Sequence, residues 1–293
     1  MRVVAVVLSW NGREDTLACL ESLLGVETIV VDNGSVDGSA DAVADSFPAV
    51  ELIRAGVNLG FAAGNNVGIR RALDEGADWV VLVNNDATVS DTFVAAVTAT
   101  AERQPDAGVL AGKVYVTEPP DTLWYAGGSF EPRLGYSGRV RGAGKRDDGS
   151  YDAEVDVDWG TGALLAVSRE AIDRAGLLDE ELFAYMEDVD WCLRIRDAGL
   201  RVVFAPSIQA WHRVSASTGG AASTTSLYYH CRNTLAVCER SRPLGRGHTG
   251  GRRTVIVGTH LAQALLHPTR RAAIWAVVRA WRDYRRGRMG RRR

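Results

Sequence analysis

The sequence predicts an α/β fold built on a mostly parallel, Rossmann-like sheet flanked by helices, with a basic helical extension at the C-terminus. Three observations predict it. Short apolar runs alternate with helical patterns through the first 83 residues, which is the rhythm of parallel strands joined by crossover helices. Polar clusters follow several of these runs, where such sheets bind their ligands. Arginines accumulate in residues 239–293.

The strands and helices are predicted in the following order. Strands are expected at residues 2–8, 28–31, 50–53 and 79–83, and helices at residues 14–24, 40–47 and after Gly64. Residues 115–158 are rich in Gly, Pro, Tyr and Asp, which predicts hairpins and loops that cover a cleft. A strand at 163–167, a helix at 169–175 and a strand at 202–204 follow.

Composition describes a globular chain with a substantial core. The 293 residues are 46% hydrophobic, enough for one large domain or for a domain with an appendage. The four cysteines form no CxxC pair, which favours reduced thiols in a cytosolic compartment over a disulfide framework or a zinc site. The apolar run at residues 3–8 is too short to span a membrane and lacks a cleavage signature, so we expect a buried strand and no export signal.

The net charge of −2 hides a strong asymmetry. Residues 239–293 contain fifteen arginines and only two acids, Glu239 and Asp283, so this segment carries +13. The preceding 238 residues carry the balance, −15. Such a split predicts an acidic body joined to a basic segment that meets an anionic partner.

A linker at residues 242–251 contains four Gly and one Pro, so we expect a body at residues 1–240 and a tail at residues 241–293. The apolar patterns at residues 255–266 and 272–281 are too short to span a bilayer. A basic amphipathic helix that carries Trp is typical of an anchor at a membrane surface. The alternative is a helical pair docked on the body with a solvated arginine face, and nucleic acid is the least favoured partner.

Three acids, Glu187, Asp188 and Asp190, stand among large apolar side chains. In a helix, Asp188 would share a side with Trp191, where partial desolvation raises the pKa of a carboxyl group toward that of a general base. The alternative is a helix N-terminus, where acids favour the helix dipole and Asp190 pairs with Arg194 four residues on.

Polar clusters also follow the first two predicted strands. Ser9, Trp10 and Asn11 come after the first strand, and Asp32 and Asn33 come at the end of the second. An acid in the position of Asp32 can accept a hydrogen bond from the N3–H group of a pyrimidine base or from a ribose hydroxyl. The alternative is a plain turn with a helix N-cap.

Residues 58–68 contain three Gly and three Asn just before a helical pattern. Small residues let a ligand approach the backbone, and amide side chains both donate and accept hydrogen bonds. The chain contains neither GxGxxG nor GxxxxGK[ST], so a dinucleotide fingerprint and a P-loop are not supported. A nucleotide-like ligand at the helix N-terminus is still expected.

Asn84, Asn85 and Asp86 follow the apolar strand at residues 79–83, which puts Asp86 at the rim of the cleft. A hard divalent cation takes few protein oxygens and leaves positions for substrate phosphates, which suits a single Asp there. His212 follows another short strand and is a candidate second ligand. The alternatives are a strand-ending turn for Asp86 and a structural role for His212.

Taken in order, these segments resemble the family 2 glycosyltransferases of the GT-A fold, over about residues 2–240. The matching segments are residues 9–11, 32–35, 58–65, 84–86 as a version of the DxD motif, 159–162, 187–190 and His212. Each motif is weak alone, whereas the ordered set is specific. Within the family the chain is most similar to the bacterial rhamnosyltransferase-like branch, which builds cell-wall and surface polysaccharide linkages.

The resemblance implies a role for each matching residue. Residues 1–114 would form the nucleotide-binding half, with the nucleotide-sugar held by Ser9, Trp10, Asn11, Asp32, Asn33, Asn58, Gly60, Asn65 and Asn85. Asp86 and His212 would bind Mg²⁺ or Mn²⁺ on the diphosphate, and Asn84 stands where many members carry a first Asp, which implies weaker metal binding. Residues 115–240 would form the acceptor-binding and catalytic half. There Asp188 matches the catalytic base, and the residues that contact the acceptor or orient the base would be Trp159, Gly160, Thr161, Glu187 and Asp190.

The implied reaction is an inverting transfer of a sugar from a nucleotide-sugar donor to a hydroxyl group of a saccharide acceptor. Rhamnose from dTDP-rhamnose is the first expectation, with UDP-hexoses next, and the expected acceptor is linked to polyprenyl diphosphate. The protein would work in the cytoplasm, peripherally on the inner face of the plasma membrane, without nucleic acid. A soluble acceptor and a homo-oligomer remain open.

Two other classes of protein fit the sequence less well. A sugar nucleotidyltransferase should carry a Gly-rich basic loop directly after the first strand, where this chain has residues 9–15, Ser-Trp-Asn-Gly-Arg-Glu-Asp. A non-catalytic sugar-binding or membrane-binding module gives no reason for Asp86, Asp188 and His212 to occur together.

Overall fold

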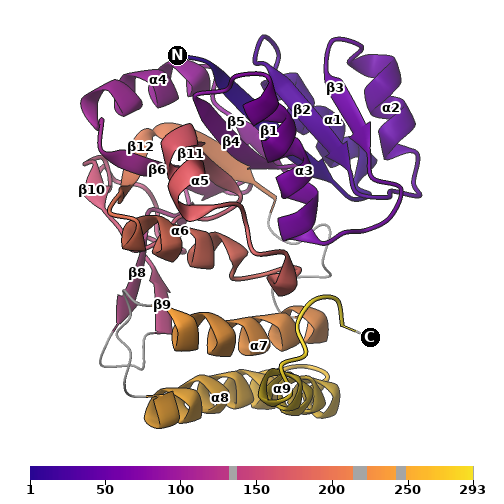
Figure 1. Cartoon of the computed structure of the whole chain (residues 1–293), viewed down its shortest axis with the longest axis vertical. Coiled ribbons are helices and arrows are strands. Elements are labelled where there is room, and N and C mark those ends of the chain that lie inside the picture. The colour runs from indigo at the N-terminus through magenta and orange to yellow at the C-terminus, as the bar shows by residue number, and fades with distance from the viewer. Residues whose placement is uncertain (132–136, 214–222, 242–248, 293) are drawn as a thin grey trace.

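The computed structural model describes residues 1–131, 137–213, 223–241 and 249–292. Figure 1 shows a central sheet flanked by helices, with a further layer of long helices beneath it. The strands in the described residues are β1 (Val3–Ser9), β2 (Thr28–Asp32), β3 (Glu51–Arg54), β4 (Trp79–Asn84), β5 (Ala87–Val89), β6 (Ala107–Val116), β7 (Leu123–Tyr125), β8 (Gly128–Glu131), β9 (Ser137–Val140), β10 (Val155–Asp156), β11 (Leu164–Ser168) and β12 (Arg201–His212).

The helices cover the sheet and form the layer beneath it. They are α1 (Arg13–Ser22), α2 (Ser39–Ser46), α3 (Phe61–Asp74), α4 (Phe93–Arg103), α5 (Arg169–Ala175), α6 (Glu187–Asp197), α7 (Thr224–Arg240), α8 (Thr249–Leu266) and α9 (Arg270–Arg285), with a 3₁₀ turn η2 (Glu180–Leu182). The strands and helices predicted within the first 83 residues are present, with one correction: the helix expected after Gly64 begins at Phe61, so Gly64 and Asn65 lie inside it.

The large sheet is mixed and mostly parallel. Its main path runs in the order β10-β12-β6-β11-β4-β1-β2-β3, with β5 paired to β12 and β7 paired to β6. Along this path β3, β2, β1, β4, β6 and β12 point the same way, whereas β11 and β10 run antiparallel to their neighbours. The predicted fold class is therefore confirmed.

The apolar composition of β1 and β2 explains their central place. Both strands are buried along nearly their whole length, as continuous β-branched runs are when helices cover both faces of a parallel sheet. The register pairs Ser9 with Asp32, and Leu8 with Asn84. The carboxyl ends of β1, β2 and β4 therefore lie at one edge, which brings the predicted polar clusters together.

Two glycines let α3 approach the sheet closely. A Cβ atom at Gly68 would lie 2.4 Å from a methyl carbon of Val6, and one at Gly64 would lie 2.5 Å from a methyl carbon of Leu8. Any larger residue would push the helix away from β1. The glycines thus position the N-terminus of α3, at Phe61, beside the strand ends.

Three features of the sheet differ from the sequence prediction. The strand expected at residues 202–204 continues to His212 as β12. Helix α4 and strand β6 occupy residues to which the pattern assigned no element. In β6 the apolar run is interrupted by Lys113, which is buried because its ammonium group bonds Asp147 at 2.8 Å and Asp152 at 2.5 Å. Long-range ion pairs of this kind leave no periodic signal in a sequence.

Helices α7, α8 and α9 share a second apolar core with η2 and α6. Arg240 at the end of α7 pairs with Asp179 at 2.6 Å and with Asp190 at 2.9 Å, which ties this layer to the body. The two predicted tail helices are present within α8 and α9. Helix α8 begins at Thr249, so the last three residues of the predicted linker are helical, and the others lie outside the described residues.

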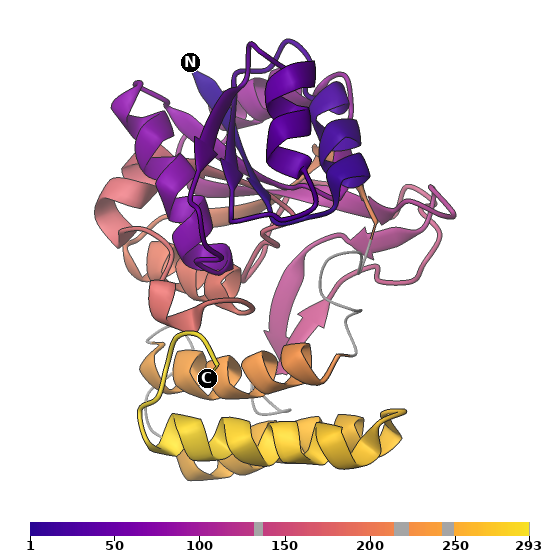
Figure 2. The same ribbon diagram turned by 90° about the vertical axis from the view of Figure 1, so that its right-hand side faces the viewer.

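Figure 2 shows α9 running beneath α7, with the C-terminal residues turning back toward the body. Within the described residues, no helix combines the length and the apolar composition that crossing a membrane requires. The predicted boundary near residue 240 stays a prediction, since α7 packs with both tail helices.

Candidate active site

The ends of β1 and β2 form one hydrogen-bonded platform. The Asn33 N–H group donates to the Ser9 carbonyl oxygen at 2.7 Å, and the Asn11 N–H group donates to Ser35 Oγ at 2.8 Å. Asn11 has a φ of 60°, a left-handed conformation that Asn tolerates better than most residues. The loop after β1 is therefore fixed against the loop after β2. Trp10 is the most exposed predicted site residue of this loop, at 39%.

Asp32, the last residue of β2, lies on the buried side of this platform. Its side chain is buried, and Oδ1 accepts a hydrogen bond from the Ser35 N–H group at 3.2 Å. That leaves Oδ2 without a hydrogen-bond partner among the described residues. A buried carboxylate with a spare acceptor atom is suited to an N–H or O–H donor of a nucleoside.

Asn33 joins the platform to the loop before α3. Its Oδ1 accepts from the Leu59 N–H group at 2.8 Å, and its Nδ2 donates to the Gly60 carbonyl at 3.1 Å. Asn58 folds back onto the Gly60 N–H group at 2.8 Å. Gly60 has a φ of 90°, and a Cβ atom there would lie 2.5 Å from the Phe183 carbonyl oxygen. The loop therefore fits only with glycine at this position.

Two predicted nucleotide-binding residues are buried and bond to protein. Asn65 lies inside α3 and donates to the Phe61 carbonyl at 3.0 Å. Asn85 donates to the Asn11 carbonyl at 3.2 Å and to Thr16 Oγ1 at 2.9 Å. In this arrangement Asn65 and Asn85 support the loops that line the platform.

Asp86 and His212 face each other at the end of β4 and β12. His212 Nε2 lies 2.9 Å from Asp86 Oδ1 and 3.3 Å from Asn84 Nδ2. Both side chains are buried, and the Trp124 ring packs edge-on against the His212 ring at a centroid distance of 4.7 Å. His212 is the last residue of a twelve-residue strand, so the strand itself brings the imidazole to Asp86 across 126 positions of sequence.

This pair fits a divalent cation with partial protein coordination. Two ligands that sit at right angles about 2.1 Å from one ion are separated by about 3.0 Å, close to the distance that the pair shows. The described residues contain no group of three or more His, Cys, Asp and Glu side chains that could hold a metal by themselves. A cation here would need oxygens from a ligand, as diphosphate-bound Mg²⁺ does.

Asp188 lies in the first turn of α6, and its carboxylate is half-buried. Its Oδ2 accepts from the Gly162 N–H group at 2.9 Å, and its Oδ1 accepts from the Val189 N–H group at 2.7 Å. Burial raises the pKa of this carboxyl group above its usual value, while the two N–H groups act in the opposite direction. Burial outweighs these hydrogen bonds, so the pKa of the carboxyl group is raised on balance.

Glu187 and Asp190, the two acids near Asp188, differ in their hydrogen-bond partners. Burial and the charges of Asp188 and Asp190 raise the pKa of Glu187 well above its usual value, and Glu187 Oε2 has no hydrogen-bond partner among the described residues. Asp190 instead accepts from Arg194 Nε at 2.8 Å and pairs with Arg240. The predicted pairing of Asp190 with Arg194 is thus confirmed, and it coexists with the unusual carboxyl groups beside it.

Residues 159–162 form a loop that packs against α6. The Trp159 carbonyl accepts from the Tyr125 hydroxyl at 2.5 Å, while Trp159 Nε1 is buried without a partner among the described residues. Gly160 donates its N–H group to Cys192 Sγ at 3.3 Å. Thr161 Oγ1 accepts from the Ala163 N–H group at 3.3 Å. This loop is therefore held against α6 at the Cys192 and Asp188 positions.

One backbone contact connects the platform with the base. The Phe61 N–H group, at the start of α3, donates to the Phe183 carbonyl at 2.6 Å, just before α6. Motif reasoning did not identify this link, nor Arg232 and Asn233 of α7, which bond the same segment. A polar pair inside an otherwise apolar helix face is the signal that points to them.

The fold and these three regions, a strand-end platform, the buried Asp86–His212 pair and the half-buried Asp188 carboxylate, are those of an α/β enzyme. The chain belongs to the family described as glycosyltransferase like family 2, whose model matches residues 2–228, and it is a glycosyltransferase.

Its relatives include several rhamnosyltransferases. It is 30% identical over 234 residues to the N-acetylglucosaminyl-diphospho-decaprenol L-rhamnosyltransferase of Mycobacterium tuberculosis, which covers 73% of this chain and 75% of the relative. It is 26% identical to the dTDP-rhamnosyl transferase RfbF of Shigella flexneri, over 72% of this chain and 69% of the relative. The chain is thus similar to rhamnosyltransferases over most of its length.

A solved structure supports the fold. The crystal structure of GalNAc-T7 with UDP, GalNAc and Mn²⁺ superimposes with a TM-score of 0.62 at 14% sequence identity. The match covers 87% of this chain, which spans about half, 53%, of the GalNAc-T7 chain. At this identity the likeness shows the shared architecture.

Proposed function

We propose that the chain is an inverting rhamnosyltransferase that moves rhamnose from dTDP-rhamnose to a hydroxyl group of a saccharide linked to polyprenyl diphosphate, in the assembly of a cell-wall or surface polysaccharide. The observation that carries the proposal is Asp188: a half-buried carboxylate, fixed by the Gly162 N–H group, beside a segment bonded to the nucleotide platform. The names of the two relatives support the choice of donor, and that of the mycobacterial relative supports the acceptor.

Asp188 supplies the base in this reaction. A sugar hydroxyl is a weak nucleophile, so Asp188 accepts its proton as the oxygen attacks the anomeric carbon of the donor. The bond to the nucleoside diphosphate breaks on the opposite face, and one displacement inverts the configuration. Glu187, whose raised pKa favours its protonated form, is a candidate hydrogen-bond donor to the acceptor.

The platform holds the nucleotide in this proposal. Asp32 takes the base or ribose, Trp10 offers an exposed ring, and the loop at Asn58 and Gly60 closes the pocket from the α3 side. Asp86 and His212 would hold Mg²⁺ or Mn²⁺, which when bound stabilises the negative charge of the leaving diphosphate. The Mn²⁺ in the GalNAc-T7 structure supports this choice of ion.

A donor screen tests the function. The full-length protein is incubated with dTDP-rhamnose, UDP-glucose or UDP-N-acetylglucosamine, a polyprenyl-diphosphate-linked saccharide and Mg²⁺ or Mn²⁺, and released nucleoside diphosphate is measured. We expect release from dTDP-rhamnose that depends on the acceptor. Acceptor-dependent release from a UDP-hexose and not from dTDP-rhamnose would replace the donor, whereas no acceptor-dependent release from any of the three donors would contradict the proposed transfer.

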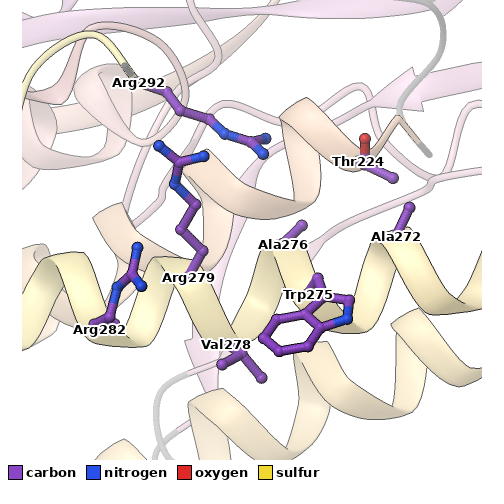
Figure 3. Close-up of a pocket in the computed structure, with 8 residues that line it drawn as sticks. All are labelled: Thr224, Ala272, Trp275, Ala276, Val278, Arg279, Arg282 and Arg292. Carbon is purple, nitrogen blue, oxygen red and sulfur yellow. The ribbon is translucent and has the colours of Figure 1, made fainter.

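We also propose that residues 241–293 keep the enzyme on the anionic inner face of the plasma membrane, with residues 1–240 as the catalytic body. On α8 and α9, Leu266 and Trp275 are 88% and 71% exposed. A hollow of about 370 Å³ is lined by residues of α7 and α9 and by Arg292. In Figure 3, Trp275 and Val278 lie on one side, and Arg279, Arg282 and Arg292 gather on the other. An exposed apolar ring among arginines, as at Trp275, suits binding to an anionic lipid surface.

Vesicle binding tests this part of the proposal separately. The full-length protein should bind phosphatidylglycerol vesicles at least about 10-fold more tightly than phosphatidylcholine vesicles. Trp275→Ser should weaken the first interaction several-fold, because an exposed ring no longer enters the interface. Val36→Ser, which changes a 91% exposed residue far from α9 in sequence, is the matched control. If Trp275→Ser and Val36→Ser bind phosphatidylglycerol vesicles equally well, α9 does not contact the membrane through Trp275.

A further inference from the structure

The segment that leads into α6 has an unfavourable backbone conformation. Phe183, Tyr185 and Met186 have φ angles of 65°, 68° and 73°, all in the left-handed region and none of them glycine. Bulky residues adopt such angles only where the surrounding structure holds them. Met186 is the N-cap residue of α6, so the strained segment ends directly before Glu187 and Asp188.

A single buried amide on α7 holds this segment. Asn233 Nδ2 lies 2.9 Å from the Leu182 carbonyl oxygen, 2.9 Å from that of Ala184 and 2.7 Å from that of Tyr185. Asn233 is fully buried. The NH₂ group has two N–H bonds, so one of them is shared between two of the three carbonyl oxygens, and together they fix the peptide planes that the left-handed angles require.

Arg232 sets the orientation of that amide. Its Nε donates to Asn233 Oδ1 at 2.9 Å, so the NH₂ end of the amide must face the carbonyl groups. Its Nη2 adds a bond to the Leu182 carbonyl at 3.1 Å, and its Nη1 donates to the Gly290 carbonyl at 2.7 Å. Arg232 is also buried, at 5.0 Å from the Tyr229 ring centroid. The pair forms a clamp with both members satisfied.

The clamped segment connects both sides of the proposed site. The Phe183 carbonyl accepts from Phe61 of the nucleotide half, and the Phe183 ring occupies the space that a side chain at Gly60 would need. Helix α6 begins at Glu187, four residues after Phe183, and carries Asp188 to the Gly162 N–H group. A shift of the segment would therefore move the base relative to the donor.

We infer that Asn233 is a positioning residue for the transferase reaction: through the left-handed segment 183–186 it fixes Asp188 against the nucleotide-binding half. The inference rests on the proposed function. It adds a role for α7, since Asn233 touches no group assigned to donor, acceptor or metal.

Kinetics of Asn233→Ala test the role. We expect kcat to fall about 30-fold or more, while the Kd of the nucleoside diphosphate stays within about twofold, because the hydrogen bonds of Asp32, Asn33 and Asn58 within the platform involve no residue of α7. Asn66→Ala is the matched control. Asn66 is an equally buried amide that bonds Leu178 in both directions, at 2.9 and 3.1 Å, outside the left-handed segment. Equal kcat values for the two variants would overturn the inference.

Glycine at position 186 provides a rescue. Glycine adopts left-handed angles without the steric penalty, so Met186→Gly should restore part of kcat in the Asn233→Ala background. Met186→Ala removes the same side chain but keeps the penalty, and it should not restore activity. If Met186→Gly and Met186→Ala both restore kcat, or if neither does, the loss of kcat in Asn233→Ala comes from altered packing and not from the left-handed backbone angles. If Asn233→Ala does not fold, Asn233→Ser, which keeps one donor, takes its place and should give an intermediate kcat.

Hydrogen exchange gives a readout that does not need turnover. The Gly162 amide, which bonds Asp188, should lose protection in Asn233→Ala and keep it in Asn66→Ala. Unchanged protection in both variants would contradict the positioning role. If the wild-type protein transfers no sugar from any donor, the proposed function fails, and the exchange result still decides whether Asn233 fixes Asp188.

Discussion

In residues 1–114 the proposed nucleotide-binding groups stand at the ends of regular strands, whereas Asp188 follows a left-handed segment that regular structure does not support. Ser9 and Asp32 are paired in the register of β1 and β2, so the sheet itself positions them. Asp188 is fixed by the Gly162 N–H group and by the contacts of Asn233 with the preceding residues. The first half is preformed by sheet geometry, and the second is held by side chains from distant elements.

This difference has a consequence for variants. Changes at the base or its supports should affect turnover more than nucleotide affinity, and changes in the strand-end loops should do the reverse. The following predictions test that separation, from the largest expected effect to the smallest.

Asp188→Asn should have the largest effect. We expect kcat to fall about 10³-fold, since a general base contributes 10²- to 10⁴-fold, while the Kd of the nucleoside diphosphate stays within about twofold. Released nucleoside diphosphate and calorimetric titration measure the two quantities. Glu181→Gln, which changes an exposed acid on the same approach to α6, should keep wild-type values. Equal losses of turnover and affinity in Asp188→Asn would contradict the separation.

Metal removal should have the next largest effect. EDTA should reduce turnover about 10²-fold, and added Mn²⁺ or Mg²⁺ should restore it. Asn84→Asp should lower the Mn²⁺ concentration at half-maximal activity, because it places a carboxylate where an amide lies 3.3 Å from His212 Nε2. His212→Ala should raise that concentration. Turnover that EDTA does not change would exclude the metal from the reaction.

Gly60→Ala should weaken nucleotide binding about 10-fold and lower the free energy of unfolding by about 2 kcal/mol, because it combines a left-handed φ with a clash against Phe183. Gly56→Ala is the matched control, with a φ of 75° and no atom within 4 Å of the added Cβ. It should lose only about 1 kcal/mol and keep nucleotide affinity. Equal affinities for the two variants would show that the Gly60 contact does not matter for binding.

The smallest effect concerns pH. The pKa of Glu187 is raised in the folded protein, so this group binds a proton on folding and adds stability as the pH falls. The wild-type Tm should therefore rise as the pH falls toward the ordinary pKa of a glutamate, and it should rise less in Glu187→Gln. Because the pKa of Asp188 is also raised, activity should be lost as the pH falls through that value. Identical slopes of Tm against pH in both proteins would contradict the shift at Glu187.

Much of the fold could be predicted, because β1, β2 and β4 are continuous apolar runs and their ends carry polar clusters. Strand β6 could not, since Lys113 interrupts its pattern and is compensated by acids more than thirty residues away. In the candidate site, the strand-end groups and Asp188 were identifiable by residue type and order. Asn65 and Asn85 could be assigned by motif, but only the structure shows that they bond to protein.

The amino-acid sequence alone determined the α/β class, the strand-end clusters, the acidic segment at residues 187–190 and the basic tail, because each is a local pattern of burial or charge. Only the tertiary structure decided that β11 enters the sheet antiparallel, that His212 reaches Asp86, and that Asn233 holds the residues before Asp188. Those features depend on contacts between residues 48 or more positions apart. Local patterns carry no information about which distant groups will meet, and chain packing supplies it.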